Sequence, residues 1–152
     1  MAHVMATDLI VKLDQTYLQN LMTIEQQCHA FPMSEKLMAS CLSGRYSAYG
    51  CLQNNTLQGF YILEQVGPDY TLMDICVSPE NQGKGLAKAM LTHLLGVVKV
   101  ANGENVFLEV RQSNLAAIHL YTAFDFVETG VRKNYYPSEF GREDAILMAL
   151  SF

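Results

Sequence analysis

The feature that most constrains the fold of this chain is a change of hydrophobic period near its middle. Residues 70–77 form an apolar, strand-like run, residues 78–85 form a short loop that carries two glycines, and residues 86–100 follow helical spacing. A strand that enters a helix through a glycine loop is typical of α/β proteins. The first N–H groups of such a helix lack partners and lie at the positive end of its dipole. The sequence therefore predicts an α/β fold with a loop that attracts phosphate.

The remaining segments predict a mixed sheet flanked by helices, in the order βααβββαβαββ. The predicted strands are residues 8–13, 46–53, 57–66, 70–77 and 106–110 with two more around residues 138–142, and the predicted helices are residues 18–26, 34–44, 86–100 and 114–124. Asn54-Asn55 tolerates the positive φ angles of a hairpin turn, so the early strands should pair antiparallel. Crossover helices after the fourth strand favour parallel pairing. Because no repeat or linker divides the chain, we expect one domain over residues 1–152.

Composition and charge exclude several classes of protein. Of the 152 residues, 50% are apolar and 16% charged, which rules out a fibrous or disordered chain. The net charge of -5 argues against nucleic acid as a main partner. The longest apolar stretch is interrupted by charges and the N-terminus lacks a secretion signal, so we expect a cytoplasmic protein without a membrane partner. The cysteines stand singly, which predicts reduced thiols and no zinc site.

The glycine loop is a candidate phosphate site. Gly83 and Gly85 remove side chains that would block a ligand from the backbone, and Lys84 and Lys88 add positive charge. The loop lacks the Lys-Ser/Thr pair of a nucleotide-hydrolysing P-loop, and a dinucleotide-binding motif would have its third glycine at Lys88. On the residues alone, a phosphate-binding loop and a glycine turn that only begins a helix both stay open.

A family resemblance favours the binding loop. Residues 77–87 resemble the acetyl-CoA loop of the GNAT N-acetyltransferases, whose pattern Gln/Arg-x-x-Gly-x-Gly/Ala is met by Gln82, Gly85 and Ala87. Residues 29–32, 108–111, 113–114, 132–137 and 141–146 resemble the RimI branch of that family. The resemblance implies the GNAT acyl-CoA N-acyltransferase fold, a mixed and mostly antiparallel sheet flanked by helices. It also implies acetyl-CoA as co-substrate and the N-terminal alanine of a small-subunit ribosomal protein as acceptor.

Acetyl transfer to an amine needs a base for the amine and an acid for the departing CoA thiolate. Glu109 lies in the apolar run of residues 106–110, where desolvation would raise its pKa, and the Tyr121 phenol can donate a proton at neutral pH. From the residues alone, Glu109 could instead face solvent on an alternating strand, and Tyr121 could belong to a core stripe. The resemblance implies Glu109 as the base and Tyr121 as the acid.

The resemblance also implies a set of cofactor-binding residues. Asn114, on the same helical face as Tyr121, matches an asparagine that contacts the cofactor. Residues 75–77 match the strand edge that hydrogen-bonds the pantetheine. The complete predicted set is Ile75, Cys76, Val77, Gln82, Gly83, Lys84, Gly85, Leu86, Ala87, Lys88 and Asn114.

The sequence gives weaker support for two other kinds of site, a cysteine nucleophile and a metal site. Cys76 could accept the acetyl group, but the sequence shows no nearby histidine to activate it, so direct transfer is preferred to a covalent intermediate. His29, His93 and His119 are scattered, and no carboxylate spacing completes a metal site around them. We therefore expect these histidines on the surface or in loops, and no metal.

Two positions depart from the family pattern. Met33 follows Phe31-Pro32 where RimI proteins have Trp, which affects acceptor fit more than catalysis. Asp125 stands where the pattern has Gly, and we expect it to end a helix in the left-handed conformation at a small cost in stability.

The acceptor side favours a basic peptide. The negative net charge would attract a basic tail, and Tyr135-Tyr136 offers rings for extended backbone or a guanidinium. The competing functions are a lysine or small-amine acetyltransferase and a CoA-binding module without catalysis. The presence of both Glu109 and Tyr121 speaks against the binding module.

Overall fold

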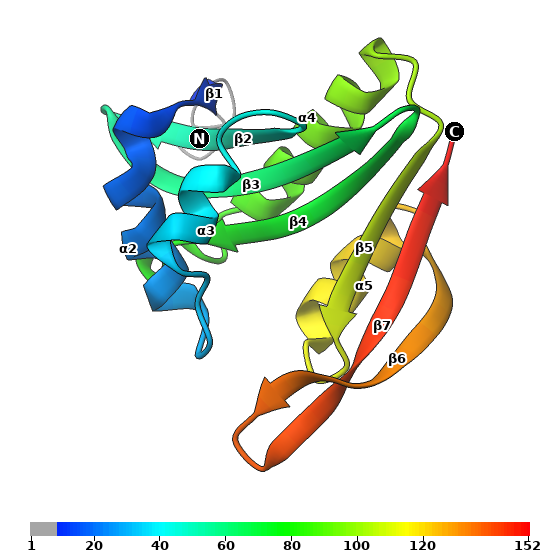
Figure 1. Cartoon of the computed structure of the whole chain (residues 1–152). Coiled ribbons are helices and arrows are strands. Elements are labelled where there is room, and N and C mark those ends of the chain that lie inside the picture. The colour runs from blue at the N-terminus through cyan, green and yellow to red at the C-terminus, as the bar shows by residue number, and fades with distance from the viewer. Residues whose placement is uncertain (1–8) are drawn as a thin grey trace.

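The computed structural model describes residues 9–152, which form one seven-stranded sheet with helices on both faces (Figure 1). The strand order is β1-β2-β3-β4-β5-β7-β6, and only β4 and β5 pair in parallel. The strands are β1 (Ile10–Leu13), β2 (Tyr46–Gln53), β3 (Thr56–Val66), β4 (Asp69–Val77), β5 (Asn105–Arg111), β6 (Val127–Ser138) and β7 (Gly141–Ser151). The helices are α2 (Leu18–Cys28), α3 (Glu35–Ser40), α4 (Leu86–Val100) and α5 (Leu115–Ala123), with short 3-10 turns η2 (Gln15–Tyr17) and η3 (Pro79–Asn81).

This architecture confirms the predicted element order and the mixed, mostly antiparallel sheet. Asn54 and Asn55 adopt φ angles of 54° and 63° in the turn between β2 and β3, as expected for that hairpin. The predicted strand at residues 8–13 begins at Ile10, and residue 8 lies outside the described part of the chain. No helix within residues 9–152 combines the length and the apolar character needed to cross a bilayer.

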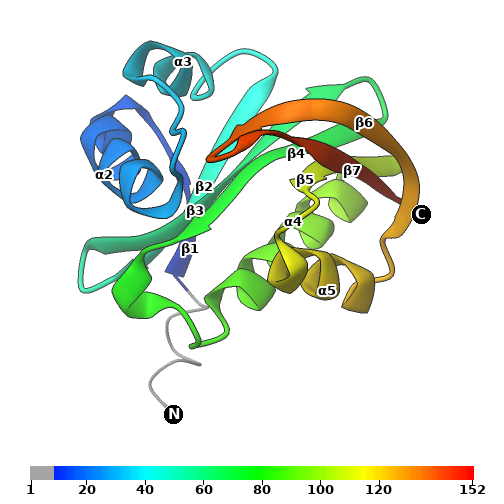
Figure 2. The ribbon, with the colours of Figure 1, turned by 90° about the horizontal axis from the view of Figure 1, so that it is seen from below.

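Two apolar cores hold the helices against the sheet, one on each face (Figure 2). Strand β3 contributes to both, because Phe60 and Ile62 pack with α2 and α3 while Tyr61 and Leu63 pack with α4 and α5. Alternate residues of a strand point to opposite faces, so a strand covered on both sides is apolar throughout. The sheet is therefore the middle layer of the protein, with a layer of helices packed on each face.

Side-chain caps mark the start of η2 and of α3. The Asp14 carboxylate accepts the N–H of Thr16 at 3.0 Å at the start of η2, which leads into α2. The Ser34 hydroxyl accepts the N–H of Leu37 at 3.1 Å and begins α3. Asp and Ser favour these positions because their side chains satisfy the unpaired N–H groups of a first turn.

Asp125 follows α5 with a φ of 72°, which confirms the predicted left-handed conformation. The Phe126 N–H bonds back to the Tyr121 carbonyl at 3.1 Å and closes the helix end. A side chain in this conformation costs about 1 kcal/mol relative to glycine. The departure from the family pattern thus preserves the helix end that positions Tyr121.

Candidate active site

The site is built where the two parallel strands separate. β4 and β5 pair only between residues 69–72 and residues 105–108. Beyond Leu72, β4 stays with β3, and beyond Leu108, β5 stays with β7. Figure 1 shows the two strands diverging from a common end. Their separation opens the sheet and leaves space for ligands between its halves.

A first cleft of about 380 Å³ lies on the side of the opening that faces α2 and the β6–β7 hairpin. The charged side chains in its walls are Glu25, Asp74, Glu109 and Arg111, and Arg132 pairs with Glu109 from outside the cleft. A further acidic group, Glu143, lies 3.6 Å from the Arg111 guanidinium. Apolar and aromatic walls come from Phe31, Met33, Leu37, Ile75, Tyr121 and Tyr136. The cleft thus combines paired acidic and basic side chains with aromatic surface.

A second cleft of about 520 Å³ lies between the N-terminus of α4 and the side of α5. Gly83 and Gly85 line it with φ angles of 79° and 81°, and a Cβ added at either would meet no atom within 4 Å. Gly85 is the N-cap of α4 and has no side chain that could cap the helix. The first backbone N–H groups of α4 therefore have no side-chain hydrogen-bond partner. The loop therefore has the open backbone and positive helix end that bind phosphate.

Tyr121 and Ile75 line both clefts. Tyr121 is only 5% exposed, and its ring packs against Phe126 with centroids 5.8 Å apart. Burial raises the pKa of the Tyr121 phenol above its ordinary value, so the hydroxyl keeps its proton at neutral pH. A proton donor therefore lies where a ligand in one cleft would meet a ligand in the other.

Glu109 lines the first cleft, but its surroundings differ from the apolar pocket expected from the sequence. Strand alternation buries Val106, Leu108 and Val110 on the other face of β5. The Glu109 side chain is 28% exposed, and its carboxylate forms an ion pair with the Arg132 guanidinium of β6. Because the less buried face of β5 lines the cleft, Glu109 is both accessible to solvent and available to a ligand.

Arg111 joins two walls of the first cleft. Its guanidinium lies 4.5 Å from the ring centre of Tyr136 and 5.6 Å from that of Phe31, and it donates to the Pro137 carbonyl at 2.7 Å. These contacts connect the segment after α2 with the β6–β7 hairpin across the end of β5. Sequence reasoning missed this role, because the three segments are far apart along the chain.

The predicted cofactor residues divide between the clefts. Eight of them line the second cleft: Ile75, Val77, Gln82, Gly83, Gly85, Leu86, Ala87 and Lys88. Lys84 instead donates to Asn81 at 3.1 Å, and the buried Cys76 side chain packs in the core beneath α2. Asn114 lines the first cleft, and its side chain accepts the Ala117 N–H at 3.2 Å as the cap of α5. The direct cofactor contact of Asn114 stays a prediction, with a structural role now visible beside it.

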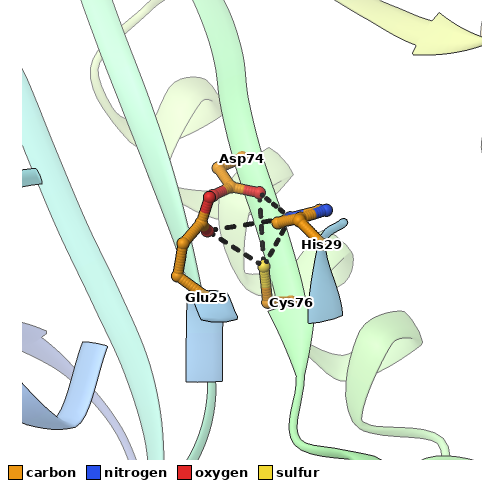
Figure 3. A group of neighbouring side chains, drawn as sticks. All are labelled: Glu25, His29, Asp74 and Cys76. Carbon is orange, nitrogen blue, oxygen red and sulfur yellow. Dashed lines mark hydrogen bonds and ion pairs between the residues drawn. The ribbon is translucent and has the colours of Figure 1, made fainter. Parts of the chain in front are cut away.

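His29 lies in the loop after α2, as predicted, but the expectation that no histidine lies near Cys76 was wrong. His29 Nε2 lies 3.1 Å from Cys76 Sγ and 3.1 Å from Asp74 Oδ1, with Glu25 Oε1 at 3.6 Å (Figure 3). α2 packs across β4, so a histidine distant in the sequence reaches this cysteine. The spacing of Glu25 and His29 by four residues, and of Asp74 and Cys76 by two, was the signal that could have found the cluster.

The other histidines have simpler surroundings. His93 is half-buried and its Nδ1 lies 2.7 Å from the Tyr61 hydroxyl, while burial lowers its pKa. His119 is exposed, as predicted. Within residues 9–152, Glu25, His29, Asp74 and Cys76 are the grouping with metal-ligating side chains close together.

The titratable side chains of this cluster shift the pKa values of one another. Burial and the adjacent Asp74 raise the pKa of Glu25 to about 8. A hydrogen bond to Asp74 raises the pKa of His29, and the pKa of Asp74 is lowered because hydrogen bonds from His29 and Glu25 outweigh its burial. A hydrogen bond with Cys28 and burial raise the pKa of the Cys76 thiol, which argues against a free thiolate nucleophile.

A sheet opened between two parallel strands, an open glycine loop at a helix N-terminus and two clefts that meet at a buried tyrosine are typical of a group-transfer enzyme with two substrate sites. The sequence pattern of the acetyltransferase (GNAT) family matches residues 14–126, and the chain belongs to this family. The fold is accordingly the GNAT fold.

Relatives within the family resemble almost the whole chain. The [ribosomal protein bS18]-alanine N-acetyltransferase of Escherichia coli is 44% identical over 141 residues, covering 93% of this chain and 95% of the relative. The Haemophilus influenzae protein of the same name is 36% identical over 142 residues, with 93% and 97% covered. The crystal structure of the Escherichia coli ribosomal-protein alanine N-acetyltransferase superimposes with a TM-score of 0.91, covering 93% of this chain and 92% of that one at 44% identity.

Proposed function

We propose that this protein transfers the acetyl group of acetyl-CoA to the N-terminal α-amine of a ribosomal protein that begins with alanine, in the cytoplasm and as a single domain over residues 1–152. The observation that carries the proposal is the meeting of the two clefts at Ile75 and Tyr121, because a donor and an acceptor react only where their sites join. The acceptor is inferred from the Escherichia coli and Haemophilus influenzae relatives, which are named for alanine of ribosomal protein bS18.

Acetyl-CoA occupies the second cleft in this proposal. Its pyrophosphate binds the amides that follow Gly83 and Gly85, with Lys88 adding charge. The pantetheine follows the edge of β4 at residues 75–77, which brings the thioester toward Tyr121. The free N-terminus of the acceptor enters the first cleft and approaches from the opposite side.

The reaction proceeds by direct attack. The neutral α-amine attacks the thioester carbon, a C–N bond forms, and the C–S bond breaks. Glu109 accepts the proton lost by the amine, and Tyr121 donates its phenolic proton to the departing sulfur. A covalent intermediate on Cys76 is disfavoured, because the raised pKa keeps its sulfur in the thiol form.

The acceptor cleft suits a peptide whose first residue is small and is followed by basic residues. Glu109 presents a partly exposed carboxylate from its wall, and the net charge of the chain is -5. The Arg132 guanidinium already lies 5.3 Å from the ring centre of Tyr135, and the Arg111 guanidinium lies 4.5 Å from that of Tyr136. The tyrosines therefore offer hydroxyls and ring edges to the peptide, and the negative net charge attracts its basic side chains.

Replacing Gly85 with Val should weaken acetyl-CoA binding by about tenfold or more, as measured by calorimetry. The added side chain projects into the space that the pyrophosphate needs, since a Cβ there meets no protein atom within 4 Å. A left-handed Val also costs about 1–2 kcal/mol of folding stability.

Gly44→Val is the matched control for that backbone cost, because Gly44 has a φ of 68°, equally open surroundings and no place in either cleft. The Gly44→Val variant should lose folding stability but keep its affinity for acetyl-CoA. Unchanged acetyl-CoA affinity in folded Gly85→Val protein would end the assignment of the loop.

Initial rates on three peptides test the acceptor. All share one basic tail; the first has a free N-terminal Ala, the second a blocked Ala and an internal Lys, and the third a free N-terminal Leu. We expect the free Ala peptide to react fastest, because an α-amine with a pKa near 8 deprotonates more readily than a lysine near 10.4.

The free Leu peptide should retain measurable activity, because Met33 can move aside for a larger first residue. A faster reaction of the blocked, Lys-containing peptide would instead identify a lysine acetyltransferase. Absence of CoA release with all three peptides and with small amines, despite acetyl-CoA binding, would identify a binding module.

A further inference from the structure

Four side chains with metal-ligating atoms lie together beside the first cleft, which three of them line, and the proposed acetyl transfer uses none of them (Figure 3). Glu25 lies in the last turn of α2 and His29 follows that helix. Asp74 and Cys76 alternate on β4 and therefore project from the same face toward α2.

We propose that this cluster binds a zinc ion through one donor atom from each side chain. The donor atoms are Glu25 Oε1, His29 Nε2, Asp74 Oδ1 and Cys76 Sγ, which all lie within 4.8 Å of one another. Thiolate and imidazole ligands favour Zn²⁺ over Mg²⁺ and Ca²⁺, which prefer oxygen alone.

The separations of these atoms fit tetrahedral coordination. His29 Nε2 lies 3.1 Å from Asp74 Oδ1, 3.1 Å from Cys76 Sγ and 3.6 Å from Glu25 Oε1. Cys76 Sγ lies 3.3 Å from Asp74 Oδ1 and 3.7 Å from Glu25 Oε1. Ligands at ordinary zinc distances in a tetrahedron are separated by about 3.3–3.6 Å. Five of the six separations are therefore close to tetrahedral values, and small side-chain movements would bring all four donor atoms around a zinc ion.

Hydrogen bonding alone does not account for the arrangement. The Nε2 atom and the thiol can each offer one proton, yet each lies close to more than one acceptor of the cluster. The Asp74 side chain is only 7% exposed, and its second oxygen, Oδ2, is buried with no hydrogen-bond partner within the described residues other than a protonated Glu25 carboxyl. A buried carboxylate oxygen without a partner is costly, and a divalent cation beside that carboxylate offsets the cost.

The surroundings supply the support and the access that a zinc site needs. The second carboxylate oxygen of Glu25 accepts the Met33 N–H at 2.9 Å, which directs Oε1 toward the cluster. The His29 side chain is 39% exposed and lines the first cleft, so an ion can enter from there. On binding, a Zn–S bond forms and the thiol proton leaves to solvent.

Zinc at this position would join the end of α2 to the middle of β4. The segment that follows His29 carries Phe31 and Met33, which line the acceptor cleft. The ion would therefore hold one wall of that cleft against the sheet, whichever acceptor the enzyme uses. The cluster was hidden from sequence reasoning because its ligands come in two pairs that are 45 residues or more apart.

The test uses the full-length protein under reducing conditions, with Zn²⁺ and Co²⁺ as probes. We expect one Zn²⁺ per chain to be retained after dialysis and the melting temperature to rise by about 5 °C or more at saturating Zn²⁺. Co²⁺ should give the near-ultraviolet thiolate-to-cobalt band and the visible spectrum of a tetrahedral site. Cys76→Ala should remove the thiolate band, and Asp74→Asn should weaken Zn²⁺ binding by about tenfold or more.

Cys51→Ala is the matched control, because Cys51 is another buried free cysteine and lies in the core on the opposite face of the sheet. It should keep both the band and the thermal shift. Retention of the thiolate band in folded Cys76→Ala protein would overturn the proposal, and so would loss of that band in Cys28→Ala with Cys76 intact. Absence of any Zn²⁺-dependent thermal shift in the native protein would also overturn it.

Discussion

Tyr121→Phe should lower the turnover number by about two to four orders of magnitude while leaving acetyl-CoA affinity unchanged. The variant keeps the ring that packs on Phe126 and loses only the hydroxyl at the junction of the clefts. Because burial raises the pKa of this phenol, the native enzyme should not lose activity through Tyr121 ionisation below about pH 10. Steady-state kinetics and calorimetry with acetyl-CoA separate the two effects.

Tyr70→Phe provides the matched control for removing a buried hydroxyl. Tyr70 lies in the same core as Tyr121 but lines neither cleft, so its variant should turn over at the native rate. If Tyr121→Phe also stayed within about threefold of the native turnover, the proton to the CoA sulfur would have to come from another group.

Glu109→Gln should likewise lower turnover by about two to four orders of magnitude near neutral pH, with acetyl-CoA binding retained. An α-amine has a pKa of about 8, so it deprotonates in solution as the pH rises, and the loss should shrink toward about pH 9. Turnover of the native and variant enzymes, measured across this range with the free Ala peptide, checks the prediction.

The ion pair with Arg132 raises a second explanation for such a loss, since Glu109 could serve only to anchor β6. Arg132→Gln separates the two roles, because it removes the anchor and leaves the carboxylate. A base at Glu109 predicts a much larger defect in Glu109→Gln than in Arg132→Gln. Equal defects that do not change with pH, and do not add in the double variant, would show that Glu109 acts by positioning.

Much of the fold follows from local patterns in the sequence. The glycine loop between β4 and α4, the asparagine turn between β2 and β3 and the left-handed Asp125 were all predicted, because each depends on backbone angles that few residue types tolerate. Loop residues and the helix that they begin are also close in the sequence. The position of most predicted cofactor residues around one cleft follows from that closeness.

The surroundings of Glu109 could not be predicted in the same way. Its neighbours in the sequence are apolar, which suggested a desolvated carboxyl, but alternation on β5 turns those neighbours to the other face. The group that pairs with it, Arg132, arrives from β6 through the pairing of distant strands. The charge beside a strand residue is set by the strands that flank it, which the local pattern does not contain.

The sequence by itself determined the order of elements, the open glycine loop before α4 and the residue types that we propose for acetyl transfer, because these depend on propensities and spacings within single segments. Only the tertiary structure decided that the donor and acceptor clefts meet at Tyr121, and that His29 reaches Cys76. Both results depend on helices packing across a sheet that opens between β4 and β5. Such contacts join residues far apart in the chain, and they form only when the apolar faces of the helices are buried against the sheet.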